Sequence, residues 1–125
     1  MKTKPIYTSK TCAPICIVKK GDFFRDNNGV RLASEKFSGA GILKGYADWC
    51  PHCQDKAKDL IDLARKNTSF NVYVIEASAD ENTALNQELG LQGFPTFFNV
   101  DDNGYVTKLP NINSINDIKN NYSLN

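Results

Sequence analysis

The stretch Trp49-Cys50-Pro51-His52-Cys53 lies where the sequence pattern changes. Before it, residues 41–47 are short and largely apolar, as a buried strand would be. Over residues 50–66, apolar residues recur at helical spacing, with charged residues on the other faces. Pro51 fits the first turn of a helix, where its missing N–H costs nothing. The pattern therefore predicts a pair of thiols at a junction between a strand and a helix.

The position of Cys50 predicts its chemistry. A residue at the start of a helix lies beside unpaired backbone N–H groups and the positive end of the helix dipole, which favour negative charge. We therefore expect Cys50 to form a thiolate readily and to act as a nucleophile. Cys53 lies about one helical turn further along, and we expect it to be a shielded resolving thiol. His52 can donate a hydrogen bond, or a positive charge when protonated, to the Cys50 sulfur; the alternative is a solvated side chain.

Length and composition describe one soluble domain. A chain of 125 residues can bury roughly two thirds of its unfolded surface. The formal net charge of +1 gives no indication of a nucleic-acid or membrane partner, and no apolar run approaches the roughly 20 residues of a membrane span. The first residues lack the apolar core of a signal peptide. We therefore expect a cytoplasmic monomer.

The remaining segments predict strands that alternate with helices. Residues 1–14 are polar and contain Pro5 and Pro14, so we expect an irregular arm followed by one domain over residues 15–125. Strands are predicted over 15–18, 41–47, 71–77, 96–100 and 105–107, and helices over 50–66, 80–89 and 115–122. Turn signals occupy residues 27–29 and 101–104, and residues 30–37 have weak helical periodicity. This order describes a mixed α/β fold.

Taken together, the Trp-Cys-x-x-Cys stretch and the segment Gly93-Phe94-Pro95-Thr96-Phe97 resemble the thioredoxin superfamily. The resemblance covers the chain from about residue 15 to its end, and the two motifs are specific together, although a lone CxxC would be weak. It implies an α/β thioredoxin fold, in which a central mixed β-sheet has helices on both faces. Pro51 and His52 resemble the dipeptide of bacterial periplasmic disulfide oxidases, whereas Trp49 and the general layout are closer to thioredoxin and protein disulfide isomerase domains.

The resemblance also implies a substrate-docking edge. Superfamily members have a cis-proline that faces the dithiol, and the residue before it pairs with an extended substrate, as in strand addition. Carried over to this chain, Pro95 is cis, and Phe94 and Pro95 form the docking edge. An ordinary loop proline is the alternative, because cis forms are only about 5–6% of X–Pro bonds. Phe94 is bulkier than the usual residue, which leaves the substrate preference open.

A further implication concerns charges beneath the dithiol. Thioredoxins have a buried aspartate six residues before the first cysteine, where this chain has Lys44. The lysine that partners this aspartate in thioredoxins corresponds here to Glu76. Since a lone buried ammonium would be costly, we expect a Lys44–Glu76 pair below Cys53 that takes part in proton transfer. The alternative is that Lys44 reaches the surface and Glu76 faces water.

Cys12 and Cys16 leave alternatives open. Four residues of extended chain span roughly 13 Å, which is too far for a disulfide unless the chain turns at Ala13-Pro14. We favour two reduced thiols here, with a second disulfide or redox relay as the alternative. The four cysteines and His52 could on paper form a zinc site, but the Phe94-Pro95 motif has no role in a zinc module, so we expect no metal.

These residues predict a thiol–disulfide oxidoreductase. The Cys50 thiolate attacks a substrate disulfide, a mixed disulfide forms, and Cys53 resolves it. No cofactor beyond the cysteine pair is needed, but the reaction requires protein thiol or disulfide substrates and a recycling reductase or oxidase. A stabilised thiolate predicts a protein more oxidising than thioredoxin. The alternatives are a cytosolic thioredoxin-like reductase and a redox-inactive peptide-binding module.

Overall fold

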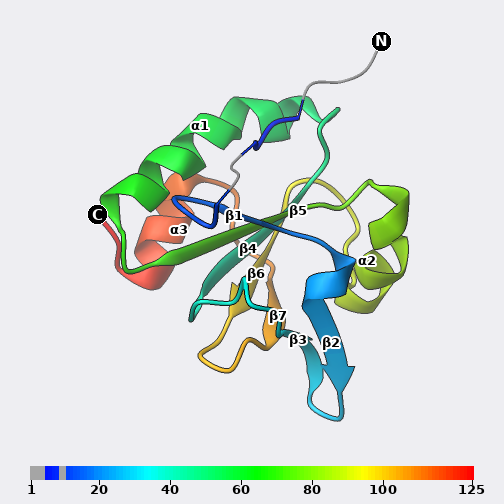
Figure 1. Ribbon diagram of the computed structural model, residues 1–125. Coiled ribbons are helices and arrows are strands. Elements are labelled where there is room, and N and C mark those ends of the chain that lie inside the picture. Colours follow the sequence, from blue (N-terminus) through cyan, green and yellow to red (C-terminus); the bar gives the residue numbers. More distant parts are fainter. Residues whose placement is uncertain (1–4, 9–10) are drawn as a thin grey trace.

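Five strands form one mixed sheet at the centre of the computed structural model, which describes residues 5–8 and 11–125 (Figure 1). The strands are β1 (Cys16–Val18), β4 (Gly41–Tyr46), β5 (Asn71–Glu76), β6 (Thr96–Val100) and β7 (Val106–Leu109). Their order across the sheet is β1-β5-β4-β6-β7. Strands β1 and β4 run parallel to β5, whereas β6 runs antiparallel to β4 and β7 antiparallel to β6. The parallel half of the sheet therefore carries the dithiol helix after its central strand.

Helices cover both faces of this sheet (Figure 1). The helices are α1 (Pro51–Lys66), α2 (Thr83–Leu89) and α3 (Ile115–Tyr122), with short 3-10 turns η1 (Lys20–Asp22) and η2 (Asp80–Asn82). Helices α1 and α3 pack on one face, and α2 packs on the other beside a separate hairpin of β2 (Phe23–Asp26) and β3 (Gly29–Leu32). Ser114 caps the last helix, because its side chain accepts a hydrogen bond from the Asp117 N–H.

Strand β4 is the strand that positions the dithiol. All six of its residues are buried, because β5 and β6 flank it and both faces of the sheet are covered. This explains why residues 41–46 are largely apolar and lack the alternation of a half-exposed strand. The chain leaves β4 at Tyr46 and enters α1 at Pro51, so Cys50 lies at the junction that the sequence predicts.

The predicted helical periodicity over residues 30–37 is wrong, because the first three residues after the turn, 30–32, belong to β3. Gly29 has a φ of 127°, a conformation that glycine adopts freely, and it allows the chain to reverse into a hairpin. Val30 and Leu32 are buried while Arg31 is exposed, which is the period of a strand. Eight residues were too short a window to separate the two periods.

The N-terminal arm contributes to the core. The described residues 5–8 and 11–14 contain no helix or strand, yet Tyr7 is only 5% exposed and belongs to the cluster beneath α1 and α3. Tyr7 packs edge-on against Tyr46 at the end of β4. The arm therefore lies over the same face as the dithiol. Within the described residues, no helix has the length and apolar character needed to cross a membrane.

Candidate active site

The two thiols of Cys50 and Cys53 lie at the start of α1. Cys50 is the residue that precedes the helix, with an extended backbone (φ −83°, ψ 117°), and Pro51 is the first helical residue. The Cys50 N–H donates to the Ala47 carbonyl at 3.0 Å, and the Cys50 carbonyl accepts from the Gln54 N–H at 3.1 Å. Both sulfurs are free thiols, and both residues are buried, Cys50 at 6% exposure and Cys53 at 0%. The helix start therefore holds a reduced dithiol with its second cysteine fully enclosed.

The environment of Cys53 disfavours its ionised form. Burial raises the pKa of the Cys53 thiol to about 11, and a hydrogen bond with Cys50 acts in the same direction. A hydrogen bond from Ala47 and the charge of Lys44 oppose this shift and lower the pKa of Cys53. Cys53 is therefore protonated near neutral pH, and it needs a proton acceptor before it can attack a mixed disulfide. This is the behaviour expected of a shielded resolving thiol.

An aromatic edge borders the dithiol. The Cys50 sulfur lies 3.8 Å from the Phe94 carbonyl oxygen, and the Phe94–Pro95 peptide bond is cis. The Trp49 side chain is 58% exposed and contacts the Phe94 ring edge-on, with 5.5 Å between ring centroids. The segment before β6 therefore lies against Cys50, with a solvent-facing tryptophan beside it.

A sequence model of the family described as thioredoxin matches residues 15–123. The chain belongs to the thioredoxin family. Curated relatives include protein disulfide isomerase-like 1-4 of Arabidopsis thaliana, 38% identical over 55 residues, and sulfhydryl oxidase 1 of Rattus norvegicus, 33% identical over 92 residues. The first alignment covers 44% of this chain and 9% of the relative; the second covers 68% and 12%. This chain therefore spans only a small part of the length of these relatives.

Solved structures confirm the predicted α/β thioredoxin fold. Thioredoxin O1 from Arabidopsis thaliana, in its oxidised state, is 14% identical with a TM-score of 0.62, covering 87% of this chain and 95% of that one. The short form of thioredoxin f from spinach chloroplast is 21% identical with a TM-score of 0.60, covering 82% and 85%. At these identities the likeness shows the fold alone. Membership of the thioredoxin family rests on the match of its sequence model over residues 15–123.

The predicted Lys44–Glu76 pair is wrong, although Lys44 is buried as expected, at 0% exposure. Among the described residues the Lys44 ammonium has one hydrogen-bond partner, the Tyr7 hydroxyl, at 2.8 Å. In the sheet Lys44 is opposite Val74, and Glu76 is opposite Tyr46, two residues further along. The ammonium turns toward the arm rather than toward the end of β5. The alternative, in which Lys44 reaches the surface, is also excluded.

Glu76 instead accepts hydrogen bonds from the two loops that follow the parallel strands β4 and β5. One of its oxygens accepts from the Asp48 N–H at 2.8 Å, and the other accepts from the backbone and hydroxyl of Ser78 at 2.7 and 2.6 Å. Burial raises the pKa of Asp48, and the neighbouring Glu76 carboxylate raises it further. The Asp48 carboxylate also accepts from the Ile6 N–H at 3.0 Å. A pair of carboxyl groups therefore fastens the arm beside the dithiol loop.

Sequence reasoning missed Tyr7 and Asp48. Tyr7 lies 37 residues from Lys44 in the chain, within a polar arm that has no periodicity. Its one signal was the apolar dipeptide formed with Ile6 in an otherwise polar segment. Asp48 carried no signal beyond its place two residues before Cys50. The backbone of His52 lies in the first turn of α1, but its side chain is outside the described part of the structure, so its role stays a prediction.

The favoured interpretation of Cys12 and Cys16 as two reduced thiols is wrong, because they form a disulfide. The chain bends over residues 11–14, where the Ala13 N–H donates to the Thr11 hydroxyl, so the extended span assumed above does not apply. Cys16 begins β1 and is 2% exposed, whereas Cys12 is exposed. Unlike Cys50 and Cys53, this pair does not lie at a helix start.

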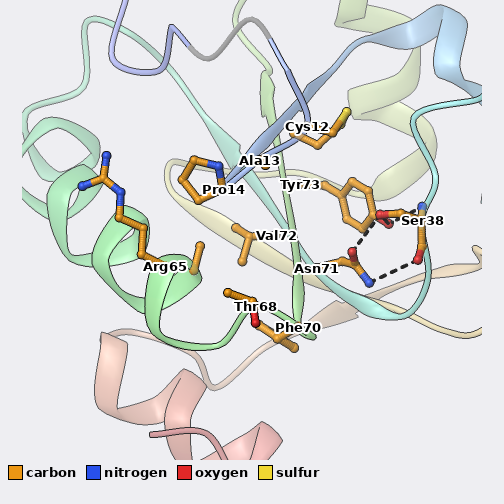
Figure 2. Close-up of a pocket in the computed structure, with 12 residues that line it drawn as sticks. Cys12, Ala13, Pro14, Ser38, Arg65, Thr68, Phe70, Asn71, Val72 and Tyr73 are labelled. Carbon is orange, nitrogen blue, oxygen red and sulfur yellow. Dashed lines mark hydrogen bonds between the residues drawn. A yellow bond between two sulfur atoms is a disulfide. The ribbon is translucent and has the colours of Figure 1, made fainter.

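A cavity of about 350 Å³ lies beside this disulfide (Figure 2). Pro14 and Cys12 border it from the bend, and Arg65 and Thr68 border it from the end of α1 and the following turn. Neither cysteine of the Cys50–Cys53 dithiol lines it. Within residues 5–8 and 11–125, no group of three or more His, Cys, Asp or Glu side chains is arranged to hold a metal ion.

Proposed function

We propose that this chain exchanges thiols and disulfides with protein substrates through Cys50 and Cys53. The observation that carries the proposal is the contact at the start of α1. There the Cys50 sulfur precedes the first helical residue and lies 3.8 Å from the Phe94 carbonyl oxygen. An extended substrate that pairs with the backbone at Phe94 brings its own sulfur toward Cys50. Trp49, exposed beside Phe94, adds an apolar contact for such a substrate.

The proposed reaction uses no cofactor other than the cysteine pair. The Cys50 thiolate attacks one sulfur of a substrate disulfide, and the other substrate sulfur leaves as a thiolate. Cys53 then loses its proton and attacks Cys50 in the mixed disulfide, which releases the reduced substrate and leaves a Cys50–Cys53 disulfide. In the opposite direction, a substrate thiolate attacks Cys50 and Cys53 leaves. Two electrons pass between protein and substrate in either case.

We further propose that the pair is more oxidising than that of thioredoxin, whose reduction potential is about −270 mV. Groups that stabilise a thiolate favour the reduced form and so make the disulfide a stronger oxidant. The start of α1 favours negative charge at Cys50, and the buried Lys44 ammonium acts electrostatically on both cysteines. Pro51 and His52 support the same direction through their resemblance to disulfide oxidases.

A recycling partner completes the cycle. One solved neighbour is thioredoxin f2 in complex with ferredoxin:thioredoxin reductase, and one curated relative is a sulfhydryl oxidase. We propose that this chain exchanges electrons with a reductase or an oxidase of this kind.

The proposal is tested by trapping its intermediate. In the Cys53→Ser variant, incubation with a protein disulfide is expected to accumulate a covalent complex at Cys50, and the matched Cys50→Ser variant is expected to form none. Both variants are made in a Cys12→Ser, Cys16→Ser background so that no other thiol can react. Insulin reduction and oxidative refolding then measure turnover, and a glutathione titration of the pair measures its potential. Peptide binding without a trapped complex or turnover would favour the redox-inactive module, and a potential near that of thioredoxin would favour the reductase.

A further inference from the structure

The buried amine of Lys44 has no carboxylate partner. Its side chain is fully enclosed on the face of the sheet that packs against α1, and its neighbours across the sheet are the uncharged Val74 and Phe97. Two ion pairs occur among the described residues, at Arg25–Glu88 and Lys36–Asp22, and neither involves Lys44. Burying a charge without a counter-charge costs free energy of desolvation. A functional role for the Lys44 amine would account for its position.

The groups around Lys44 are those of the redox site. Its ammonium donates to the Tyr7 hydroxyl at 2.8 Å and lies 5.2 Å from the centre of the Tyr7 ring. From α1, Cys53 and Cys50 act on it electrostatically. From β4, Tyr46 packs against Tyr7. The acidic groups at this end of the sheet, Asp48 and Glu76, act on Tyr46, and their oxygens bind backbone N–H groups.

We propose that Lys44, held by Tyr7, is a charge-balancing residue that takes up a proton when the Cys50–Cys53 disulfide is reduced and releases it when the disulfide forms. This proposal rests on the proposed function, because it assigns a pH dependence to the same cysteine pair. Tyr7 is a positioning residue in it. A hydroxyl can accept a hydrogen bond from an ammonium or donate one to a neutral amine, so the Lys44–Tyr7 contact can persist in both protonation states.

The reduction balances as follows. An external thiolate attacks Cys50, the bond to Cys53 breaks, and its electron pair leaves on Cys53, which takes a proton from solvent. A second external thiolate attacks the external sulfur of the mixed disulfide, so one external disulfide departs and Cys50 remains as a thiolate. The protein gains two electrons and the two external thiols lose two. Lys44 takes one further proton from solvent, and its ammonium balances the new negative sulfur.

The expected direction follows from burial. Burial lowers the pKa of Lys44 to about 8, and negative charge on the Cys53–Cys50 pair opposes that shift. In the disulfide form this opposing charge is absent, so the pKa of Lys44 is lower there than in the reduced form. Between the two values, reduction consumes a proton at Lys44. The constant for reduction by glutathione then falls by an additional factor of about ten for each pH unit, or about 30 mV for a two-electron couple.

The experiment is a glutathione titration of the Cys50–Cys53 pair at several pH values in wild-type protein, Lys44→Met and Tyr7→Phe. Lys44→Met is expected to lose the additional tenfold dependence per pH unit. Tyr7→Phe is expected to keep that dependence but shift it to lower pH, because the ammonium has lost its hydrogen-bond acceptor. The matched control is Tyr122→Phe, which removes a hydroxyl bonded to Asn99 on the same face of the sheet and is expected to match wild type.

Parallel pH profiles in wild type and Lys44→Met would overturn the proposal. If Lys44→Met does not fold, an unshifted profile in Tyr7→Phe overturns it in the same way. The titration needs no protein substrate, because glutathione equilibrates with any accessible cysteine pair. Absence of turnover therefore contradicts the proposed function, whereas parallel profiles with full turnover contradict only the role of Lys44.

Discussion

The two cysteine pairs occupy different places in the fold. Cys50 and Cys53 belong to the cluster beneath α1 and α3, whereas Cys16 belongs to the cluster beneath α2 and the hairpin. The first pair is reduced and lies at a helix start above a buried ammonium. The second is a disulfide that fastens a bend to the edge strand β1. The two pairs therefore differ in their surroundings as well as in their bonding, although their spacing in the chain is similar.

This separation also bears on the relay considered for Cys12 and Cys16. A direct exchange requires one sulfur to reach another, and Cys16 packs in a different core cluster from Cys50 and Cys53. The cavity beside the Cys12–Cys16 disulfide is lined by neither Cys50 nor Cys53 (Figure 2). We therefore expect the second disulfide to act locally at the bend.

The largest expected effect on stability concerns Lys44, the buried amine beneath the Cys50–Cys53 pair. Burial lowers the pKa of Lys44 from 10.5 to about 8, so between these values the unfolded chain binds more protons than the folded protein. The free energy of unfolding of the reduced wild-type protein should therefore rise with pH across this window, relative to Lys44→Met. The rise should be on the order of 3 kcal/mol. Urea unfolding at pH 7, 8, 9 and 10.5, under reducing conditions, measures it.

The matched control for this prediction is Lys108→Met, which replaces an exposed lysine on β7. Its difference from wild type should stay constant across the same pH values. If the difference in free energy of unfolding between Lys44→Met and wild type is also constant with pH, the Lys44 amine is not desolvated. The two cysteine pairs would then no longer differ by a buried charge.

The next effect concerns the cross-link. The Cys12–Cys16 disulfide closes a loop of only five residues, for which loop-closure entropy predicts about 2 kcal/mol of stabilisation. We expect Cys12→Ala to lower the free energy of unfolding by about this amount while leaving insulin reduction unchanged. Urea unfolding and the turnover assay check the two halves of the prediction. Cys12→Ala is preferred to a change at Cys16 because Cys12 is exposed, so the loss of buried packing is small.

If Cys12→Ala abolishes turnover, as Cys50→Ser should, then the proposed division of roles between the two cysteine pairs is wrong. That result would place the second pair in the electron path, through another molecule or through a motion that the structure does not contain.

Much of the fold was predictable because its signals are local. The largely apolar run of β4, the helical spacing of residues 51–66 and the Ser114 cap each fix an element within a short window. The β3 strand was missed because it has only four residues, of which the first is a glycine. The position of the dithiol was equally local, since a strand, a proline and a helical pattern adjoin it.

The parts of the site that could not be predicted depend on distant contacts. The burial of Lys44 followed from its place in a doubly covered strand, but its partner comes from the irregular arm, and no sequence period announces that contact. Glu76 was assigned to Lys44 by correspondence with the family, whereas the loop at Asp48 and Ser78 uses its oxygens. The Cys12–Cys16 disulfide was not predicted because the estimated distance assumed an extended chain, whereas residues 11–14 form a bend.

The smallest expected effect concerns the surface beside the dithiol. Trp49 is 58% exposed and touches Phe94 edge-on. Because so much of its ring is already in water, Trp49→Ala should lower the free energy of unfolding by no more than about 1 kcal/mol. Loss of an apolar docking contact of similar size should raise KM for a protein disulfide roughly fivefold. The rate with glutathione disulfide, which is too small to span this edge, should not change.

The chain offers a matched control in Phe24, which is 61% exposed on the hairpin strand β2. Phe24→Ala removes a similar exposed aromatic surface from the face of the molecule that carries no dithiol, so it should alter neither KM nor the glutathione rate. If Trp49→Ala slows the protein and the small disulfide equally, then Trp49 shapes the dithiol rather than docking the substrate. A selective loss with proteins alone assigns the aromatic edge to substrate recognition, because only a long substrate can contact Trp49 and the Phe94 backbone together.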